Sequence, residues 1–235
     1  MKKGTLYLIP SFLGESLTDA VFPSANREII SKVSYFIVEE IRTARRFLKK
    51  ICPGIEIDSL TFMIYNEHSI SADASSFLDP LLKGRDAGII SEAGTPCVAD
   101  PGSLLVRQAH ESGIQVIPLV GPSSLLLALM ASGFNGQQFV FHGYLPIDKT
   151  DRVKRLREIE QDIIKKGQTQ IFIETPYRNL QLFKSITETC QDSTLLCLAT
   201  SLTTSGESII TLPIKEWKKK KPELNKKPTV FLLYR

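Results

Sequence analysis

One strand-to-helix junction carries most of the side chains that could do chemistry. Ser91-Glu92-Ala93-Gly94-Thr95-Pro96 follows the short apolar run 88–91 and leads into Asp100-Pro101-Gly102, where an aspartate N-cap and a proline predict a helix start. In open α/β sheets, ligands bind beyond the carboxyl ends of the strands. A glycine there lets a ligand approach the backbone, and the Glu92 carboxylate can bind hydroxyls or a cation. The junction is a candidate ligand site; the alternative is a tight turn in which Asp100 only caps the helix.

Two further junctions have a similar character. Gly121-Pro122-Ser123-Ser124 begins an apolar helix, so free N–H groups and two hydroxyls are available to a ligand. Glu174-Thr175-Pro176-Tyr177-Arg178 lies between a strand and a helix in the second half of the chain. Ordinary helix capping is the alternative interpretation of both.

Several common enzyme motifs are missing from the sequence. No G-x-G-x-x-G follows the first strand, and there is no Walker A motif and no G-x-S-x-G elbow, which argues against Rossmann, P-loop and α/β-hydrolase sites. The three histidines, His68, His110 and His142, are scattered, so surface or structural roles are favoured. The four cysteines show no C-x-x-C spacing, which predicts free thiols and no metal site.

The composition is that of an ordinary globular protein. The 235 residues are 43% hydrophobic and 23% charged, with a net charge of +4, which permits a nucleic-acid partner without requiring one. Two clusters of basic residues suggest a partner with a phosphate backbone; the alternative interpretation is that each cluster is simply a solvent-exposed face of the protein. They comprise Lys149, Arg152, Lys154, Arg155 and Arg157, and then Lys215, Lys218, Lys219, Lys220, Lys221, Lys226 and Lys227. No signal peptide and no apolar run of about 20 residues is present, so we expect a cytoplasmic protein that does not enter membranes.

Apolar runs alternate with amphipathic stretches along the chain, which predicts two α/β domains. We expect domain boundaries at 1–120 and 121–235, with a mostly parallel first sheet and a mixed second sheet. The expected strands are 5–10, 35–40, 60–66, 88–91, 114–120, 139–143, 170–174, 195–200, 207–212 and 229–234. The expected helices are 27–34, 42–51, 72–83, 100–112, 150–166 and 176–189, together with 125–131, which is apolar on all sides and therefore predicted to be buried between the domains.

These motifs, in this order, resemble the tetrapyrrole-methylase superfamily. Within it, the sequence is most similar to the clade that methylates a cytidine ribose 2′-oxygen of 16S ribosomal RNA. Ser91 to Gly102 resembles the clade's S-D-A-G-T-P…D-P-G signature, and Gly121–Gly133 its G-P-S-A…A-S-G helix. Val38–Thr43 resembles its acidic strand end with an arginine-bearing helix, and Asn66-Glu67-His68 its Glu-His pair.

The resemblance implies an S-adenosylmethionine-dependent methyltransferase in which the cofactor is folded into the cleft between two domains, usually in a homodimer. It implies ribosomal RNA or the small ribosomal subunit as partner. The implied cofactor-binding residues are Pro10, Glu92, Ala93, Gly94, Thr95, Pro96, Asp100, Ser123, Ser124, Glu174, Thr175, Pro176, Ala199 and Pro228. Methylation of a ribose hydroxyl also needs a base, for which Glu39, Glu40, Glu67 and His68 are candidates, and Arg42, Arg45 and Arg46 could position phosphate.

The sequence departs from the clade's pattern in several places, and the half that the resemblance assigns to the cofactor matches better than the half assigned to the substrate. Glu39-Glu40-Ile41 stands where the clade has E-D-T, and the clade's arginine in the helix after the Glu-His pair is missing from Ser69–Leu82. Pro10-Ser11-Phe12-Leu13-Gly14-Glu15 stands where the clade has A-T-P-I-G-N, and Glu92 stands where it has aspartate. Two alternatives therefore stay open: a methyltransferase for a tetrapyrrole or other small molecule, and a catalytically silent RNA-binding relative.

Overall fold

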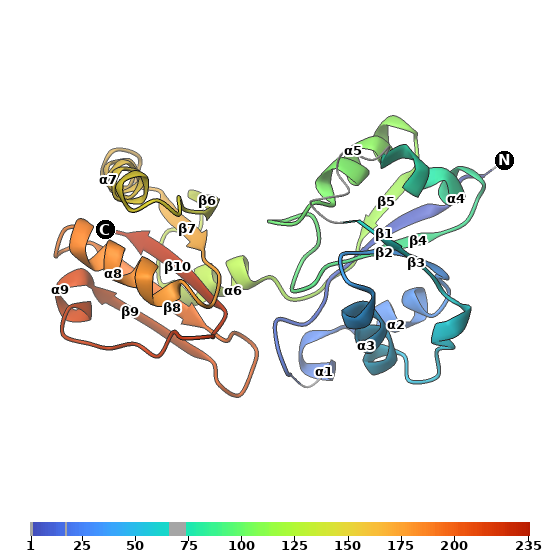
Figure 1. Ribbon diagram of the computed structural model, residues 1–235, viewed down its shortest axis with the longest axis horizontal. Coiled ribbons are helices and arrows are strands. Elements are labelled where there is room, and N and C mark those ends of the chain that lie inside the picture. The colour runs from blue at the N-terminus through green and yellow to red at the C-terminus, as the bar shows by residue number, and fades with distance from the viewer. Residues whose placement is uncertain (1, 17, 66–73) are drawn as a thin grey trace. The chain divides into compact units, whose positions relative to one another are not determined.

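The computed structural model describes residues 2–16, 18–65 and 74–235, so the candidate bases Glu67 and His68 lie outside the described residues. The chain divides into two compact units, Met1–Ser123 and Ser124–Arg235, which we call the N-terminal and C-terminal units (Figure 1). Both combine helices with a β-sheet, which confirms the predicted α/β class. The predicted division into domains 1–120 and 121–235 stays a prediction.

The described strands of the N-terminal unit form one parallel sheet in the order β3-β2-β4-β1-β5. They are β1 (Thr5–Ile9), β2 (Tyr35–Val38), β3 (Thr61–Ile64), β4 (Ala87–Ile90) and β5 (Gln115–Pro118). From β2 the chain continues outward to β3 at one edge of the sheet, whereas from β4 it crosses over β1 to β5 at the other edge. The connections of these two neighbouring strands diverge, so the switch point lies between β2 and β4, and ligands of open α/β sheets bind beyond the carboxyl ends of the strands at such a point.

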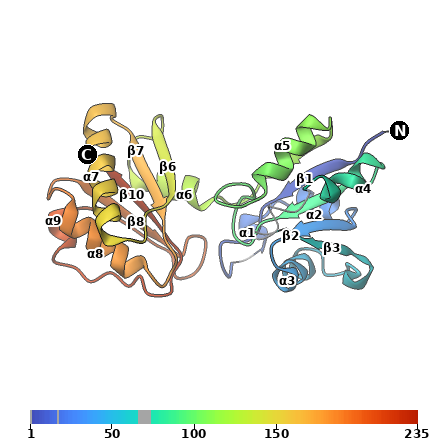
Figure 2. The ribbon, with the colours of Figure 1, turned by 45° about the horizontal axis from the view of Figure 1, so that its top comes forward.

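Helices cover both faces of this sheet. Their bounds are α1 (Thr18–Val21), α2 (Ser24–Ile30), α3 (Ile41–Ile51), η1 (Ile57–Ser59), η2 (Ala74–Leu78), α4 (Asp79–Leu82) and α5 (Ser103–Glu111). One apolar core joins the sheet to α2 and α3, and a second joins it to α4 and α5, so the two groups of helices lie on opposite faces (Figure 2). Because both faces are covered, β2 and β4 are buried at every residue, as expected for parallel strands.

Three predicted helices of this unit have different bounds in the structure. α2 begins and ends earlier than the predicted 27–34. Within the predicted helix 72–83, the described residues form 3₁₀-helix η2 followed by the single turn α4, with Pro80 in its first turn, so the segment is helical but is not one continuous α-helix. The prediction that Asp100 caps α5 is wrong: the cap position is Gly102, and Asp100 Oδ1 accepts a hydrogen bond from the Gly102 N–H at 2.9 Å. An aspartate that binds the backbone two residues ahead forms a turn, which delays the helix.

The C-terminal unit contains a mixed sheet in the order β6-β7-β10-β8-β9, as predicted. Its described strands are β6 (Phe139–Tyr144), β7 (Thr169–Ile173), β8 (Leu195–Thr200), β9 (Ser208–Pro213) and β10 (Thr229–Tyr234). Strands β6 and β7 are parallel, whereas β10 is antiparallel to both β7 and β8, and β8 is antiparallel to β9. The helices are α6 (Ser124–Ser132), α7 (Lys149–Lys166), α8 (Asn179–Thr189) and α9 (Ile214–Trp217).

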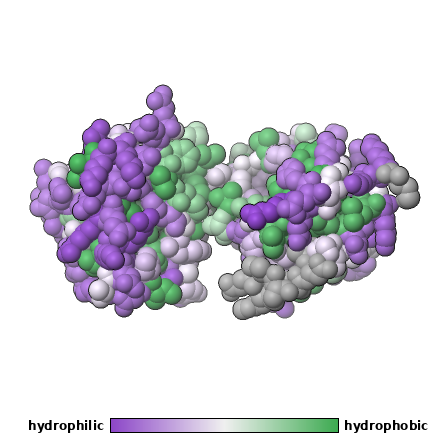
Figure 3. Space-filling model, turned by 90° about the horizontal axis from the view of Figure 1, so that it is seen from above, coloured by the Kyte–Doolittle hydropathy of each residue, from purple (hydrophilic) through white to green (hydrophobic). Residues whose placement is uncertain are grey.

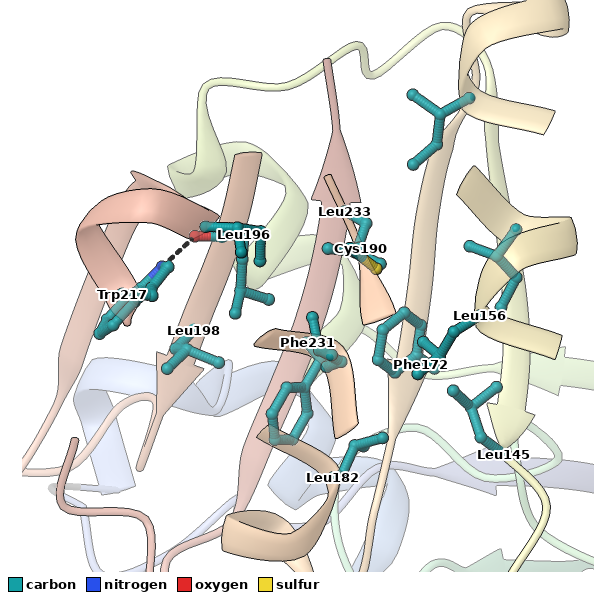
Figure 4. Packing of buried hydrophobic residues seen from close by; sticks show 14 of the residues in the cluster. Leu145, Leu156, Phe172, Leu182, Cys190, Leu196, Leu198, Trp217, Phe231 and Leu233 are labelled. Atoms are coloured by element: carbon teal, nitrogen blue, oxygen red, sulfur yellow. Dashed lines mark hydrogen bonds between the residues drawn. The ribbon is translucent and has the colours of Figure 1, made fainter. Parts of the chain in front are cut away.

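A single apolar core holds α7, α8 and α9 against this sheet (Figure 4). The rings of Phe172 and Phe231 stack there with centroids 5.9 Å apart. Trp217 is buried, and its indole N–H donates to the Leu196 carbonyl at 2.8 Å, so its polar atom is satisfied. These contacts fix α9, which the sequence pattern did not predict.

One predicted helix of this unit needs correction, and the burial predicted for another stays a prediction. α6 packs on β8, β9 and β10, whereas Leu126 and Met130 are 51% and 79% exposed, so the part of α6 that was expected to be buried between the domains is not buried by the C-terminal unit itself. α8 begins at Asn179 instead of residue 176, because Thr175–Arg178 forms a turn closed by the Arg178 N–H and the Thr175 carbonyl at 2.9 Å. Among the described residues, none of the helices is both long and apolar enough to cross a membrane.

Candidate functional site

Three loops meet at the carboxyl edge of the parallel sheet, where the sequence placed the candidate site. The Ser11 N–H, after β1, donates to the Gly94 carbonyl, after β4, at 2.9 Å. Gly121, after β5, lies so close to Pro10 that a Cβ at this position would be 2.2 Å from Pro10 Cγ. The structure therefore brings together Pro10, Gly94 and Gly121, which are far apart in the sequence.

The loop after β4 holds an unusual backbone conformation. Gly94 has a φ of 76°, and two residues with side chains, Cys97 and Ala99, have φ values of 67° and 58°. Left-handed conformations at residues other than glycine cost of order 1–3 kcal/mol each and cluster at functional sites. Around these positions Pro96 is buried, Thr95 is half-buried, and Ala93 is exposed. Burial, together with the nearby charge of Asp100, raises the pKa of the Cys97 thiol to about 12, so this cysteine stays protonated at neutral pH.

Glu92 connects this loop to the first turn of α3. Its carboxylate accepts hydrogen bonds from the Thr43 hydroxyl and from the backbone N–H of Glu40. Although Glu92 as a whole residue is exposed, burial of its carboxyl group raises its pKa above the ordinary value, opposed by these two hydrogen bonds. A carboxylate at a helix N-terminus is also favoured by the helix dipole. Thr43 was not among the predicted site residues, although it is the last residue of the Val38–Thr43 motif.

α3 presents the predicted phosphate-binding arginines on one face. Ala44, Phe47, Leu48 and Ile51 are buried on the other face, as the helical period requires. The exposed side forms an open surface pocket of about 480 Å³, lined by Arg42, Arg45, Arg46 and Lys49 together with Glu40 and Ile41. The structure thus gathers the three predicted arginines. Arg45 also makes an exposed ion pair with Asp58, and such pairs contribute little to stability.

The two candidate bases within the described residues differ in their surroundings. Glu40 is the N-cap of α3, and its Oε1 accepts a hydrogen bond from the Arg42 N–H at 2.9 Å. Its carboxylate therefore has a helix-capping role that competes with proton transfer. Glu39 is half-buried directly after β2, at the same carboxyl edge of the sheet as the three loops.

The candidate residues of the C-terminal unit fall into two groups. Glu174 is buried, and its Oε1 accepts from the Thr175 N–H at 2.6 Å and from Arg178 Nε and Nη2 at 3.0 and 2.6 Å. This carboxylate therefore stabilises its own turn, in which Pro176 is half-buried. Ala199 and Pro228 lie at the ends of neighbouring strands, and the Pro228 carbonyl accepts from the Ser201 N–H at 2.8 Å.

The remaining two candidates lie on either side of the division between the units. Ser123 is the last residue of the N-terminal unit, and Ser124 is the first residue of α6; both are half-buried.

The first basic cluster is partly structural. Arg152 is buried and donates to Ser185 Oγ at 3.0 Å and to the carbonyls of Pro146 and Ile147, so it was wrongly grouped with the surface cations. Arg155 contacts His142, whose pKa is lowered mainly by burial. The exposed members are Lys149, Lys154 and Arg157, on a largely hydrophilic face along α7 (Figure 3).

The second basic cluster contains several ion pairs. Lys218, Lys219 and Lys227 pair with Asp192, Glu216 and Glu223, respectively. All four cysteines are free, and no group of three or more metal-ligating side chains occurs in the described parts of the chain.

A parallel sheet with strained, glycine-containing loops at its switch point is the arrangement of a ligand-binding α/β enzyme, and a mixed α/β unit follows it in the chain. Comparison of this chain with known proteins supports its assignment as a ligand-binding α/β enzyme. A family model described as Tetrapyrrole (Corrin/Porphyrin) Methylases matches residues 25–218. The solved crystal structure of the methyltransferase CobJ is similar in fold, with a TM-score of 0.66 and 18% identity over 99% of this chain and 94% of that chain.

Two named relatives align along most of the sequence. "Ribosomal RNA small subunit methyltransferase I" of Pseudomonas aeruginosa is 32% identical over 216 residues, covering 92% of this chain and 72% of the relative. The protein of the same name from Vibrio cholerae is 31% identical over 211 residues, covering 90% and 69%. The chain belongs to the tetrapyrrole (corrin/porphyrin) methylase family, and the predicted family membership is confirmed. It is accordingly a methyltransferase.

Proposed function

We propose that this protein transfers a methyl group from S-adenosylmethionine to a ribose 2′-hydroxyl of small-subunit ribosomal RNA. The observation that carries the proposal is the alignment of about nine-tenths of the chain with relatives named as ribosomal RNA small-subunit methyltransferases. The gathered arginines of α3 support it, because planar cationic side chains suit phosphate groups.

The loop after β4 is the proposed centre of the cofactor site. The backbone is left-handed at Gly94, Cys97 and Ala99, and this conformation is energetically unfavourable at the two residues with side chains. Strained backbone of this kind clusters at ligand-binding sites, which supports the assignment. We assign Pro10, Glu92, Ala93, Gly94, Thr95, Pro96 and Asp100 to this site, with Ser123, Ser124, Glu174, Thr175, Pro176, Ala199 and Pro228 as further members. When bound, S-adenosylmethionine supplies an electrophilic methyl group on a sulfonium, so the protein must chiefly position the acceptor in line with it.

The acceptor hydroxyl must lose a proton as it attacks, and we assign this role to Glu39. It lies directly after β2, at the carboxyl edge of the parallel sheet where the loops after β1, β4 and β5 meet. We expect Glu39→Gln to lower kcat by about 100-fold or more while leaving cofactor binding intact. Glu40→Gln serves as the matched control, because it removes the adjacent carboxylate and keeps a capping side chain. If Glu39→Gln retains full activity, the base is another residue, with Glu67 and His68 as the remaining candidates.

Two measurements test the function itself. Isothermal titration with S-adenosylmethionine should give saturable binding, and no binding would contradict the enzymatic role and favour a catalytically silent RNA-binding relative. Purified protein should transfer labelled methyl groups to small-subunit ribosomal RNA, and mass mapping should place them on a ribose. Methylation of an added tetrapyrrole but not of RNA would instead support the small-molecule alternative.

Two features implied by the resemblance stay predictions: the homodimer and the cytoplasmic location. Sedimentation equilibrium tests the first, since a homodimer has twice the 26.2 kDa mass of one chain.

A further inference from the structure

A second cavity of the N-terminal unit lies at the switch point of its sheet. It has a volume of about 270 Å³ and is lined by the loop after β1, by α3 and by the end of β4. Ser11 and Phe12 come from the first segment, Thr43 and Arg46 from the second, and Glu92 from the third. The hydrogen bond from the Ser11 N–H to the Gly94 carbonyl holds the first and third segments together.

The cavity contains a buried hydroxyl that lacks a partner. Ser11 is only 5% exposed, and its Oγ has no hydrogen-bond partner among the described residues. Buried polar side chains are almost always hydrogen-bonded, because an unpaired one has been removed from water without a replacement partner. An unpaired hydroxyl in the wall of a cavity therefore indicates a ligand that supplies the missing hydrogen bond.

The other lining residues indicate what kind of ligand fits. Phe12 and Phe47 give the cavity apolar, aromatic walls, and the Lys50 ammonium lies 4.4 Å from the centre of the Phe12 ring. Arg46 lines both this cavity and the adjacent arginine pocket of α3. A ligand with a planar, hydrogen-bonding part and a phosphate next to it would occupy the two together. A nucleotide has this chemistry.

We propose that this cavity is the subsite for the methyl-accepting nucleoside of the RNA, with Ser11 Oγ hydrogen-bonded to that nucleoside and Arg46 at its phosphate. This proposal rests on the proposed function and specifies where the acceptor binds.

Ser11→Ala tests the subsite, because it removes the unpaired hydroxyl and little else. Without a ligand, the variant should be at least as stable as the wild type in urea unfolding. With RNA, the KM for methylation should rise roughly three- to tenfold, as expected when one hydrogen bond is removed, while the Kd for S-adenosylmethionine stays unchanged.

Ser16→Ala is the matched control. Ser16 Oγ is also buried and without a partner among the described residues, it belongs to the same loop, and it does not line the cavity. This variant should reproduce the stability of Ser11→Ala with no change in KM. An unchanged KM in Ser11→Ala would overturn the proposal, and so would a weaker Kd for S-adenosylmethionine with an unchanged KM, since the cavity would then belong to the cofactor.

Binding of a fluorescent RNA oligonucleotide, measured by anisotropy, separates this subsite from the proposed function. If the wild type binds RNA without methylating it, the proposed function fails, and weaker binding by Ser11→Ala would still support the subsite. Equal RNA binding by wild type and Ser11→Ala would reject the subsite in that case.

Discussion

Among single residues, the charged side chains chosen from sequence turned out to serve two different purposes. Glu40, Arg152 and Glu174 each have their hydrogen-bonding atoms engaged by the surrounding backbone or side chains, so they stabilise the fold locally. Glu92 and Arg46 line a cavity, although the Glu92 carboxylate also accepts hydrogen bonds from Thr43 and from the Glu40 N–H. Sequence spacing could not separate the two groups, because it does not reveal which polar groups approach from elsewhere in the chain.

Glu92 should make the stability of the protein depend on pH. Burial raises its pKa in the folded state above the ordinary value of 4.5. Its contribution to stability is therefore fully present below the unfolded-state pKa and is lost as the pH rises through the folded-state pKa. Since glutamine does not titrate, the stability of Glu92→Gln relative to wild type should increase across that range. Urea unfolding from about pH 4 to about pH 8 measures this, with the exposed Glu28→Gln as the control for the removal of one charge. If the difference in the free energy of unfolding between Glu92→Gln and the wild type does not change with pH, the pKa of Glu92 is not raised in the folded state.

Among the elements, the long helices and most strands were predicted well, and the short helices poorly. α3, α7, β8 and β10 lie within about one residue of the prediction, and the pattern of α7 is bounded by Asp148 and Gly167. The differences lie in the helices, for example at the starts of α5 and α8, where side chains such as Asp100 and Glu174 form turns that delay the helix.

Arg152 adds hydrogen bonds to the apolar contacts that attach α7 to the rest of the C-terminal unit. Arg152→Met should lower the free energy of unfolding by about 2–3 kcal/mol, because the Pro146 and Ile147 carbonyls and the Ser185 hydroxyl lose a charged donor. Arg157→Met, an exposed position on the same helix, should change it by less than about 0.5 kcal/mol. Urea denaturation compares the two. If both variants lower the free energy of unfolding equally, the hydrogen bonds of Arg152 do not contribute to stability.

The loops after β1 and β5 approach so closely that added side-chain volume at Gly121 should destabilise the protein. Gly121→Ala would place a Cβ 2.2 Å from Pro10 Cγ, a distance that requires the two loops to separate. We expect a decrease of about 1–3 kcal/mol in the free energy of unfolding and weaker cofactor binding. Gly136→Ala is the control, since nothing lies within 4 Å of a Cβ there. A Gly121→Ala protein with wild-type stability and cofactor Kd would refute the importance of this close approach.

For the whole molecule, the net charge of +4 is too small to decide the partner, so the distribution of charge is the quantity to test. Neutralising Arg42, Arg46 and Lys49 to glutamine should weaken RNA binding and reduce the slope of log affinity against log salt by about one for each phosphate that is no longer neutralised. Neutralising Lys149, Lys154 and Arg157 on α7 changes the net charge equally. We expect this control to have the smaller effect, and the opposite order would place the RNA on α7.

The sequence by itself determined the α/β class, the parallel and mixed sheets and the family, because these follow from periodic burial and from motifs whose residues are close together in the chain. Only the tertiary structure decided that Ser11, Thr43, Arg46 and Glu92 line one cavity. Those residues meet because the crossover connections of a parallel sheet bring the carboxyl ends of β1, β2 and β4 to one edge. Hydrogen bonding across that edge, and not position in the sequence, determines which polar groups are satisfied and which are left to a ligand.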